Sequence, residues 1–395
     1  MPRNGTEPPR TPPPNYRGPV ETPDVIVIGG GIAGASVAYE LAAHRSVLLL
    51  EGESSLAMHS TGRSAATYIP GHGTAIFRAL IRASAARFPA LAEELDAPPF
   101  LRPLTTVFTA LDDDGERELA ILQREWSAEP DGPRPLTGAE TDRACPGLRG
   151  SRAGAVVEAA DADAIGLHGA YVRGLRRRGG TVVQGSPVGR IEAVGGCGAV
   201  SGWRVDTAQR GWTVPDVVVA AGAWTDGLAR LAGVPPLGLR AYRRTIAISP
   251  CTVPAGMPML IDAAERFYAK PEGPETSRTG LLISPSEETP AEPGNVRPDE
   301  LDVALALERT EAALHLGLRS VRTSWAGLRT FAPDRDPVVG DRPEHHRGLH
   351  FFAGHGGSGI ESAPALAALG AAVITRTPVP ADIPVTPAQV SPTRL

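Results

Sequence analysis

Two runs of four apolar residues, Val25–Ile28 and Val47–Leu50, dominate the hydrophobic pattern near the start of the chain. An uninterrupted apolar run of this length is typical of a strand that is buried on both faces, as in a parallel sheet. A glycine-rich turn and a segment of small and apolar residues lie between the two runs. The pattern therefore predicts one β-α-β unit over residues 24–51.

The turn of this unit carries Gly29, Gly31 and Gly34, which are spaced as G-x-G-x-x-G. The first glycine allows the tight turn, the second lets a pyrophosphate approach the backbone, and the third permits close packing of helix on strand. The helix N-terminus directs unpaired N–H groups at the phosphates. Glu51 ends the second strand, where a carboxylate accepts a hydrogen bond from a ribose hydroxyl and repels the 2′-phosphate of NADP. The unit predicts a dinucleotide site for NAD or FAD.

Periodicity along the rest of the chain predicts alternating helices and strands. Asp163 is placed to cap one of the helices, and residues 200–205 and 211–214 are typical of a hairpin. The other expected helices and strands are, in chain order, helix 75–95, strand 101–110, helices 116–126, 138–143 and 163–178, strands 181–184, 217–220, 241–249, 267–270 and 281–284, helix 301–316, strand 350–353 and a helix to about 374.

These elements indicate an α/β fold, α+β overall, in which a Rossmann-like nucleotide-binding domain with a parallel sheet carries an inserted, mainly antiparallel domain. The nucleotide-binding domain is expected at 24–95, 151–239 and 321–376, and the inserted substrate-binding domain at 96–150 and 240–320. Residues 1–23 and 377–395 are rich in proline. They predict a disordered N-terminal extension and a tail that lies extended across the surface.

The composition of the chain argues against several classes of function. A net charge of -5 offers no basic surface for nucleic acid or anionic lipid. No apolar run is long enough to span a membrane, and no apolar signal segment precedes the first strand, so we expect a cytoplasmic protein. Neither the three cysteines nor the nine histidines have metal-site spacing, and we expect no metal. Lys270 is the only lysine of the chain.

Three later segments resemble a known superfamily. Residues 217–224 read VVVAAGAW, residues 325–334 read WAGLRTFAPD and residues 352–360 read FAGHGGSGI. In this order they resemble the second flavin-contacting strand, the W-x-G-x-R-x-x-x-x-D segment and the C-terminal flavin loop of the D-amino acid oxidase, glycine oxidase and sarcosine oxidase superfamily. Residues 59–66, HSTGRSAA, are similar to the flavin loop of its bacterial D-arginine dehydrogenases. The resemblance runs from about residue 24 to the C-terminus and implies that the cofactor is FAD.

The resemblance also implies which residues contact the cofactor. Val188 matches the position whose backbone meets the adenine, and the glycines of residues 356–359 can present N–H groups to the flavin pyrimidine. Taken alone, this turn is equally a tight strand-helix connection, and the nearby hydroxyls equally suit caps and turns. No cysteine occurs in residues 325–340, where sarcosine oxidases carry their covalent flavin link, so FAD is expected to be bound non-covalently. The expected cofactor-binding residues are Gly29, Gly31, Ala33, Gly34, Glu51, Gly52, Ser60, Thr61, Arg63, Ser64, Ala65, Ala66, Val188, Ala221, Gly222, Gly356, Gly357, Ser358, Gly359 and Ile360.

Enzymes of this superfamily transfer a substrate Cα–H as hydride to flavin N5 and yield an imino acid. Such chemistry requires a fixed substrate carboxylate, for which the planar fork of arginine is suited. By matching position, Arg329 and Arg244 are the candidate carboxylate ligands and Tyr268 is a candidate donor to the same carboxylate. Without the resemblance, Tyr268 is a packed sheet aromatic, and one residue of the pair Arg243-Arg244 must face away.

Three positions depart from the D-arginine dehydrogenase pattern. Thr67 stands where that pattern has a histidine, His72 where it has a tyrosine, and Leu104 where it has the acid that pairs with a guanidinium. Because leucine cannot offset a buried cation, we hypothesise a substrate that is not D-arginine or D-lysine, and a kinetic preference for either would refute this. His72 is either a polar, proton-handling residue or a loop histidine on the surface. Glu361 can meet a substrate amine or a helix N-terminus.

Three functions remain open. The first is an FAD-dependent D-amino acid dehydrogenase or oxidase with a non-basic substrate, reoxidised by oxygen or a quinone. The second is oxidation of an N-substituted glycine or a specialised secondary amine in a biosynthetic pathway. The third is a flavin-binding scaffold without catalysis, against which the carboxylate ligands Arg244, Tyr268 and Arg329 argue.

Overall fold

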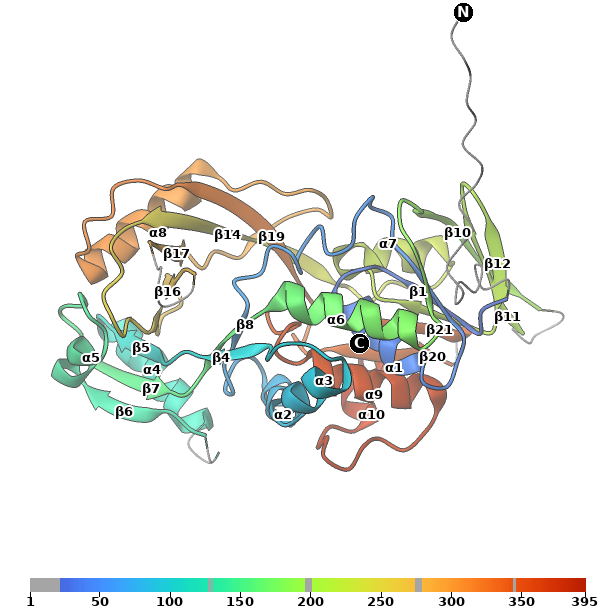
Figure 1. The fold of residues 1–395 in the computed structure, drawn as a ribbon, viewed down its shortest axis with the longest axis horizontal. Helices are drawn as coiled ribbons and strands as arrows, with labels where there is room; N and C mark the ends of the chain where they lie inside the picture. Colours follow the sequence, from blue (N-terminus) through green and yellow to red (C-terminus); the bar gives the residue numbers. More distant parts are fainter. Residues whose placement is uncertain (1–21, 127–128, 130, 196–200, 274–278, 344–345) are drawn as a thin grey trace, which may run out of the picture.

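The computed structural model describes residues 22–126, 129, 131–195, 201–273, 279–343 and 346–395. The molecule is elongated, with a parallel-sheet lobe at one end and an antiparallel-sheet lobe at the other (Figure 1). The expected N-terminal extension lies almost entirely outside the described residues, as do Cys197 and Val200. The predicted α/β fold class is confirmed.

The predicted β-α-β unit is present as β1 (Val25–Ile28), α1 (Ile32–Leu41) and β2 (Val47–Leu50). Gly29 has a φ of +118°, a backbone conformation that side chains with a Cβ rarely adopt. A Cβ at Gly34 would lie 1.8 Å from the Gly29 carbonyl oxygen, so only glycine lets the helix start this close to the strand. The two glycines therefore fix the start of α1 against the end of β1.

A six-stranded sheet in the order β20-β21-β13-β1-β2-β9 is the centre of this lobe. All its neighbours are parallel except the edge pair of β20 and β21. Alternate residues of β1 and β2 point into two separate apolar cores, which explains why both strands are apolar throughout. The remaining strands are β9 (Thr181–Val183), β13 (Asp216–Val219), β20 (Val338–Arg342) and β21 (His346–Ala353).

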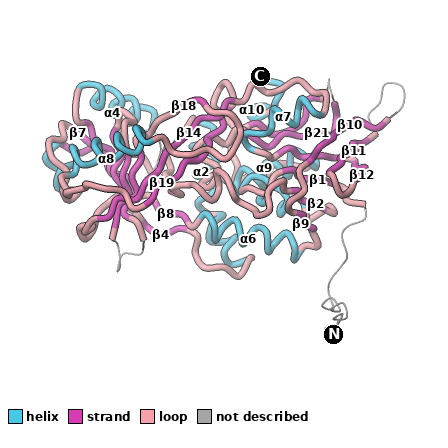
Figure 2. The backbone as a smooth tube through the Cα atoms, turned by 90° about the horizontal axis from the view of Figure 1, so that it is seen from above, coloured by secondary structure: helices cyan, strands magenta, loops and turns pink. Residues whose placement is uncertain are grey.

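Helices cover one face of this sheet and a small sheet covers the other. The helical core contains side chains of α1, α2, α3, α6 and α9, and the opposite core contains Trp203 and Trp212 of the three-stranded sheet β10-β11-β12. Figure 2 shows β10, β11 and β12 at the end of the molecule remote from the antiparallel lobe. These elements are α2 (Ala75–Ala85), α3 (Arg87–Glu94), α6 (Ala164–Arg177), α9 (Ala363–Thr375), β10 (Val188–Val194), β11 (Gly202–Thr207), β12 (Gly211–Val214), η1 (Gly222–Trp224) and α7 (Thr225–Leu231).

The other lobe is built on a nine-stranded sheet in the order β18-β14-β17-β16-β15-β5-β7-β6, with β19 paired to β14. Its pairs are antiparallel except β15 with β5. Helix α8 packs on one face, and the other face turns toward the parallel-sheet lobe. The elements are β5 (Thr106–Ala110), α4 (Asp113–Trp126), β6 (Arg134–Thr137), α5 (Gly138–Ala144), β7 (Ala153–Val157), β14 (Arg240–Pro250), β15 (Met259–Asp262), β16 (Tyr268–Pro271), β17 (Gly280–Ser284), β18 (Thr289–Pro290), α8 (Glu300–Leu314) and β19 (Thr323–Phe331).

A second small sheet, β3-β8-β4, connects the lobes through β3 (Thr67–Tyr68), β8 (Ala160–Ala162) and β4 (Leu101–Pro103). Lys270 of β16 is buried beside this sheet, and its Nζ lies 2.5 Å from Asp161 Oδ1 and 2.5 Å from the Ala65 carbonyl oxygen. The single lysine of the chain thus ties the antiparallel sheet to the loop before β3.

Several elements differ from the sequence-based prediction. The helix expected at 75–95 is two helices, because Pro89 has no N–H and its ring clashes with the carbonyl of Ala85 in a continuous helix. The strand expected at 101–110 is two strands in different sheets, β4 and β5. Strands β7 and β19 pair within the nine-stranded sheet, whereas the expected boundaries assign their residues to the nucleotide-binding domain.

The C-terminal segment does not lie extended across the surface. It forms α10 (Pro387–Val390) and η3 (Pro392–Arg394), and Ile383, Val385 and Val390 are buried in the helical core. Arg394 Nε donates to Asp334 Oδ2 over 2.7 Å. Burial of these apolar side chains holds the segment in place. The high proline content of the segment gave no indication of this burial. Within the described part of the chain, no helix is both long and apolar enough to cross a membrane.

Candidate active site

A cavity of about 570 Å³ lies where the two lobes meet. Its floor is formed by the residues that follow the carboxyl ends of β1, β2 and β13, the usual ligand position in a parallel α/β sheet. Its far wall comes from the antiparallel sheet, through β14, β16 and β19. The cavity therefore joins a dinucleotide end to a separate end lined by Arg244, Tyr268 and Arg329.

The structure brings nearly all the predicted site residues together here. Every expected cofactor-binding residue lines the cavity except Gly34 and Ser358, and the five expected catalytic residues also line it. Gly34 lies at the contact of helix and strand instead. Ser358 is buried behind the lining, with its Oγ 3.4 Å from His72 Nδ1. The catalytic set is Arg329, Tyr268, Arg244, His72 and Thr67.

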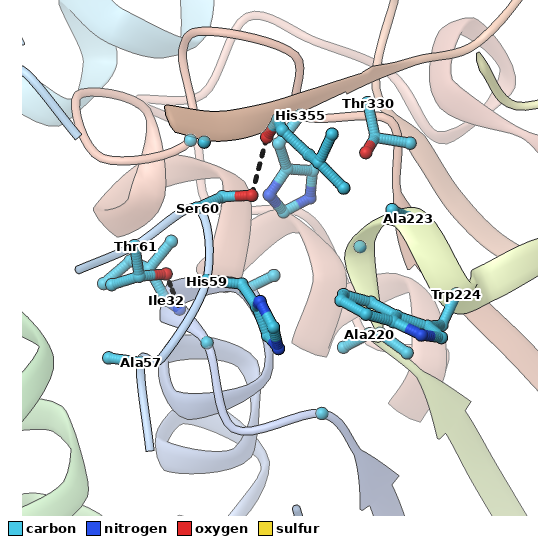
Figure 3. Close-up of a pocket in the computed structure, with 18 of the residues that line it drawn as sticks. Ile32, Ala57, His59, Ser60, Thr61, Ala220, Ala223, Trp224, Thr330 and His355 are labelled. Carbon is cyan, nitrogen blue, oxygen red and sulfur yellow. Dashed lines mark hydrogen bonds between the residues drawn. The ribbon is translucent and has the colours of Figure 1, made fainter. Parts of the chain in front are cut away.

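The dinucleotide end is held by hydrogen bonds around Glu51. Its carboxylate accepts from the Gly30 N–H over 2.6 Å and from the Glu53 N–H over 2.8 Å. Thr61 Oγ1 accepts from the Ile32 N–H over 2.9 Å, at the first turn of α1 (Figure 3). These bonds fix the turn and helix N-terminus in the arrangement that suits a pyrophosphate.

The segment 59–66 is fastened mainly to β19. Ser60 Oγ donates to the Leu328 carbonyl oxygen over 2.6 Å (Figure 3), and Arg63 Nη1 donates to the carbonyl oxygens of Ala326 and Val296 over 3.0 and 3.1 Å. Ser64 Oγ accepts from the Ala66 N–H. These side chains therefore hold the loop in the cavity wall, which is the turn chemistry that the sequence left open as an alternative to cofactor contact.

Two buried polar atoms of cavity-lining residues, His59 Nδ1 and His355 Nε2, have no hydrogen-bond partner among the described residues. Burial lowers the pKa of His355 to about 4, so its ring is neutral at physiological pH. The His59 and Trp224 rings lie 4.6 Å apart on the cavity wall (Figure 3). Unpaired buried polar atoms are costly unless a ligand satisfies them, and together with the glycine-lined floor they fit a large polar cofactor such as FAD.

Arg329 is the central cation of the other end. It is partly buried, and this burial together with the neighbouring Arg244 guanidinium lowers its pKa. Among the described residues, no carboxylate lies within ion-pair distance of the Arg329 guanidinium and none of its N–H groups has a hydrogen-bond partner. Arg244, by contrast, donates from Nε to the Glu287 carbonyl oxygen over 2.9 Å and lies 3.6 Å from Glu288 Oε1. A partly buried arginine in a cavity wall, with no partner for its guanidinium, fits a site for an anionic ligand group.

His72 and Glu361 are in direct contact, although they are far apart in sequence. Glu361 does not line the cavity, and its carboxylate accepts from the Ile69 N–H over 2.9 Å and bonds His72 Nδ1. It meets neither a helix N-terminus nor the interior of the cavity. Arg243 faces away from Arg244, as expected, and pairs with Asp302 of α8 over 2.6 Å.

Sequence reasoning missed four notable lining residues: His59, Trp224, Ile246 and His355. Three of them stand inside the family-like segments, since His59 opens HSTGRSAA, Trp224 closes VVVAAGAW and His355 lies in FAGHGGSGI. Their position inside these segments is the sequence signal that indicates a place in the site. Ile246 carried no signal beyond its place in a strand.

The chain belongs to the FAD dependent oxidoreductase (DAO) family, whose model matches residues 24–373. It is therefore an FAD-dependent oxidoreductase. It is 27% identical to a glycine oxidase of Bacillus licheniformis, with 90% of this chain and 94% of that protein covered. It is 26% identical to one of the opine oxidase subunits of Agrobacterium tumefaciens, with 85% and 89% covered. The crystal structure of a glycine oxidase from Geobacillus kaustophilus superimposes with a TM-score of 0.82 at 23% identity, covering 95% of this chain and all of that one.

Proposed function

We propose that this enzyme oxidises the Cα–N bond of an amino acid that has a non-basic side chain. The observation that carries the proposal is that the partly buried guanidinium of Arg329 and the buried hydroxyl of Tyr268 line one cavity, and neither has a partner among the described residues. A substrate carboxylate satisfies both groups at once, because the guanidinium offers two parallel donors and the phenol a third. The similarity of residues 59–66 to D-arginine dehydrogenases favours a D-amino acid.

The residues that would hold FAD are those of the dinucleotide end and the glycine-rich turns, with Glu51 at the ribose. The bound flavin supplies a hydride acceptor for the substrate Cα–H. Neither Cys145 nor Cys251 lines the cavity, which supports non-covalent binding. The task left to the chain is to fix the substrate carboxylate, exclude water and manage the proton of the amine.

The wall near Arg329 favours a neutral side chain. Ile246 lines it and belongs to an apolar cluster that also contains the buried Leu104, Tyr268 and Trp126. The acidic residues among the described cavity lining are Glu51 and Glu53, and both belong to the dinucleotide end. A cationic substrate side chain would therefore lack a counter-ion, at a cost of several kcal/mol.

A secondary amine is the second candidate. The opine oxidase relative covers most of this chain, and the carboxylate ligands suit an N-substituted amino acid equally well. The two candidates differ only in the group attached to nitrogen, so the same assay separates them.

The test is the anaerobic flavin spectrum of the purified protein during titration with pools of D-amino acids, L-amino acids and N-substituted glycines. The proposal expects bleaching by a pool of non-basic D-amino acids and no bleaching by D-arginine or D-lysine. Bleaching by N-substituted glycines alone moves the assignment to the second candidate. A flavin that no amino acid reduces contradicts the proposal.

A further inference from the structure

A buried carboxylate holds His72, a histidine that lines the cavity and whose side chain reaches solvent. Glu361 is 2% exposed, at the end of the glycine-rich turn that precedes α9, whereas the His72 side chain is 36% exposed. Glu361 bonds His72 at Nδ1 and is itself fixed by the Ile69 N–H. Ser358 Oγ lies 3.4 Å from the same Nδ1. Both partners of the ring therefore use Nδ1, and no described residue hydrogen-bonds Nε2.

This arrangement selects one form of the ring. An ionised carboxylate at Nδ1 requires a donor there, so the neutral imidazole carries its proton on Nδ1 and offers the Nε2 lone pair. In a catalytic triad, a carboxylate orients the histidine base in the same way, by accepting a hydrogen bond from Nδ1–H so that Nε2 is free to take a proton. The segment that carries His72 is itself fixed, because the His72 N–H donates to the Ile69 carbonyl oxygen and Gly71 packs against the Trp126 ring.

We propose that His72 is the base that removes a proton from the substrate ammonium group, and that Glu361 is the residue that positions it. In this step one N–H bond of the ammonium breaks, its electron pair stays on the amine nitrogen, and the proton forms a bond to His72 Nε2. The partly exposed ring then releases the proton to water. The inference rests on the proposed function, since it supplies the neutral amine that oxidation of the Cα–N bond requires.

Other charged groups around this segment already have partners. Arg78 donates to the Gly73 carbonyl oxygen over 2.9 Å and lies 3.4 Å from Glu125, and Asp336 bonds Thr74 Oγ1. Arg82 pairs with Asp131 over 2.9 Å. Burial raises the pKa of Tyr68 to about 12, which keeps that phenol neutral. Glu361 is thus the charged group in direct contact with the His72 ring.

The test compares wild type with His72→Gln and Glu361→Gln across pH, with bleaching by the best substrate as the signal. We expect kcat/KM of His72→Gln to be lower by roughly 10²-fold at neutral pH and to approach wild type near the pKa of the substrate ammonium, where no base is needed. Glu361→Gln keeps an acceptor for the Ile69 N–H and should show a loss of roughly tenfold. Exposed His44→Gln is the matched control and should equal wild type in rate and pH profile.

A second readout does not depend on turnover. The ring ¹⁵N shifts of His72 should show the Nδ1–H form in wild type and a mixture of forms in Glu361→Gln. A loss in His72→Gln that is the same at every pH, or an unchanged ring form in Glu361→Gln, overturns the inference. Wild-type protein that no amino acid reduces overturns the proposed function instead, so the two failures are distinguishable.

Discussion

Arg244 and Arg329 lie on the same face of adjacent strands, yet only Arg244 has a carboxylate beside it. In the antiparallel register of β14 and β19, Arg244 is opposite Gly327 and Arg329 is opposite Tyr242. Glu288, which also pairs with Arg335 over 2.8 Å, lies 3.6 Å from Arg244. Two cations thus share one wall, and Arg329, the one without a carboxylate beside it, is left for a ligand.

We predict that Arg329→Met and Arg329→Lys each lower kcat/KM by roughly 10²- to 10³-fold, because lysine does not reproduce the planar fork. Arg329→Met should also raise the melting temperature of the ligand-free protein, since it removes a partly buried cation without a partner. Steady-state kinetics and thermal unfolding measure the two effects. Arg240→Ala, at an exposed position of the adjacent strand β14, is the control and should change neither.

Replacing Tyr268 by phenylalanine removes a buried hydroxyl that has no partner among the described residues. We expect KM to rise roughly 10- to 100-fold, the value of a hydrogen bond to a charged group, with a smaller change in kcat. The free energy of unfolding should stay the same or rise by about 1 kcal/mol. A clear loss of stability with unchanged KM would show that the hydroxyl is structural.

His355 should make the flavin-free protein sensitive to acid. Its pKa is about 4 in the fold and about 6.5 in the unfolded chain, so between these values only the unfolded chain binds the extra proton. Stability is therefore lost as pH falls from 6.5 to 4, by up to about 3 kcal/mol. Urea unfolding of His355→Gln should lack this part of the loss. The same pH dependence in both proteins would assign it to other groups.

Lys270 should be needed for flavin affinity. It joins the Ala65 carbonyl oxygen to Asp161, so Lys270→Met removes both contacts and loosens the loop that precedes β3, while the half-buried Asp161 keeps its ion pair with Arg102. We expect a loss of roughly 1–3 kcal/mol in stability, the value of hydrogen bonds to a charged group, and a higher Kd for FAD. Equal FAD binding in wild type and Lys270→Met contradicts this role.

The nucleotide-binding half was predictable because its signals are local. The apolar runs of β1 and β2, the glycine spacing and the Asp163 cap each act within a few residues, and each is present as expected. Each family-like segment contributes lining residues to the same cavity. The segments that are recognisable from the sequence are therefore the ones that build the site.

The remaining features depend on contacts between distant residues, which no local pattern encodes. The contact of His72 with Glu361 spans 289 positions, and the Lys270 contacts span more than 100. The missed strand β19 has polar and apolar residues without clear alternation, and its nine residues are a strand because β14 pairs with them along their full length. The tail is ordered because its few apolar residues are buried by α9 and its neighbours.

The most direct test of the central claim compares a substrate amino acid with its carboxamide. Both have the same Cα–N bond, but only the first carries the anion that Arg329 and Tyr268 are proposed to bind. We predict that the amino acid bleaches the flavin anaerobically at least roughly 10²-fold faster than the amide in wild type, and that Arg329→Met abolishes this preference. Equal bleaching rates for acid and amide in wild type would contradict the account.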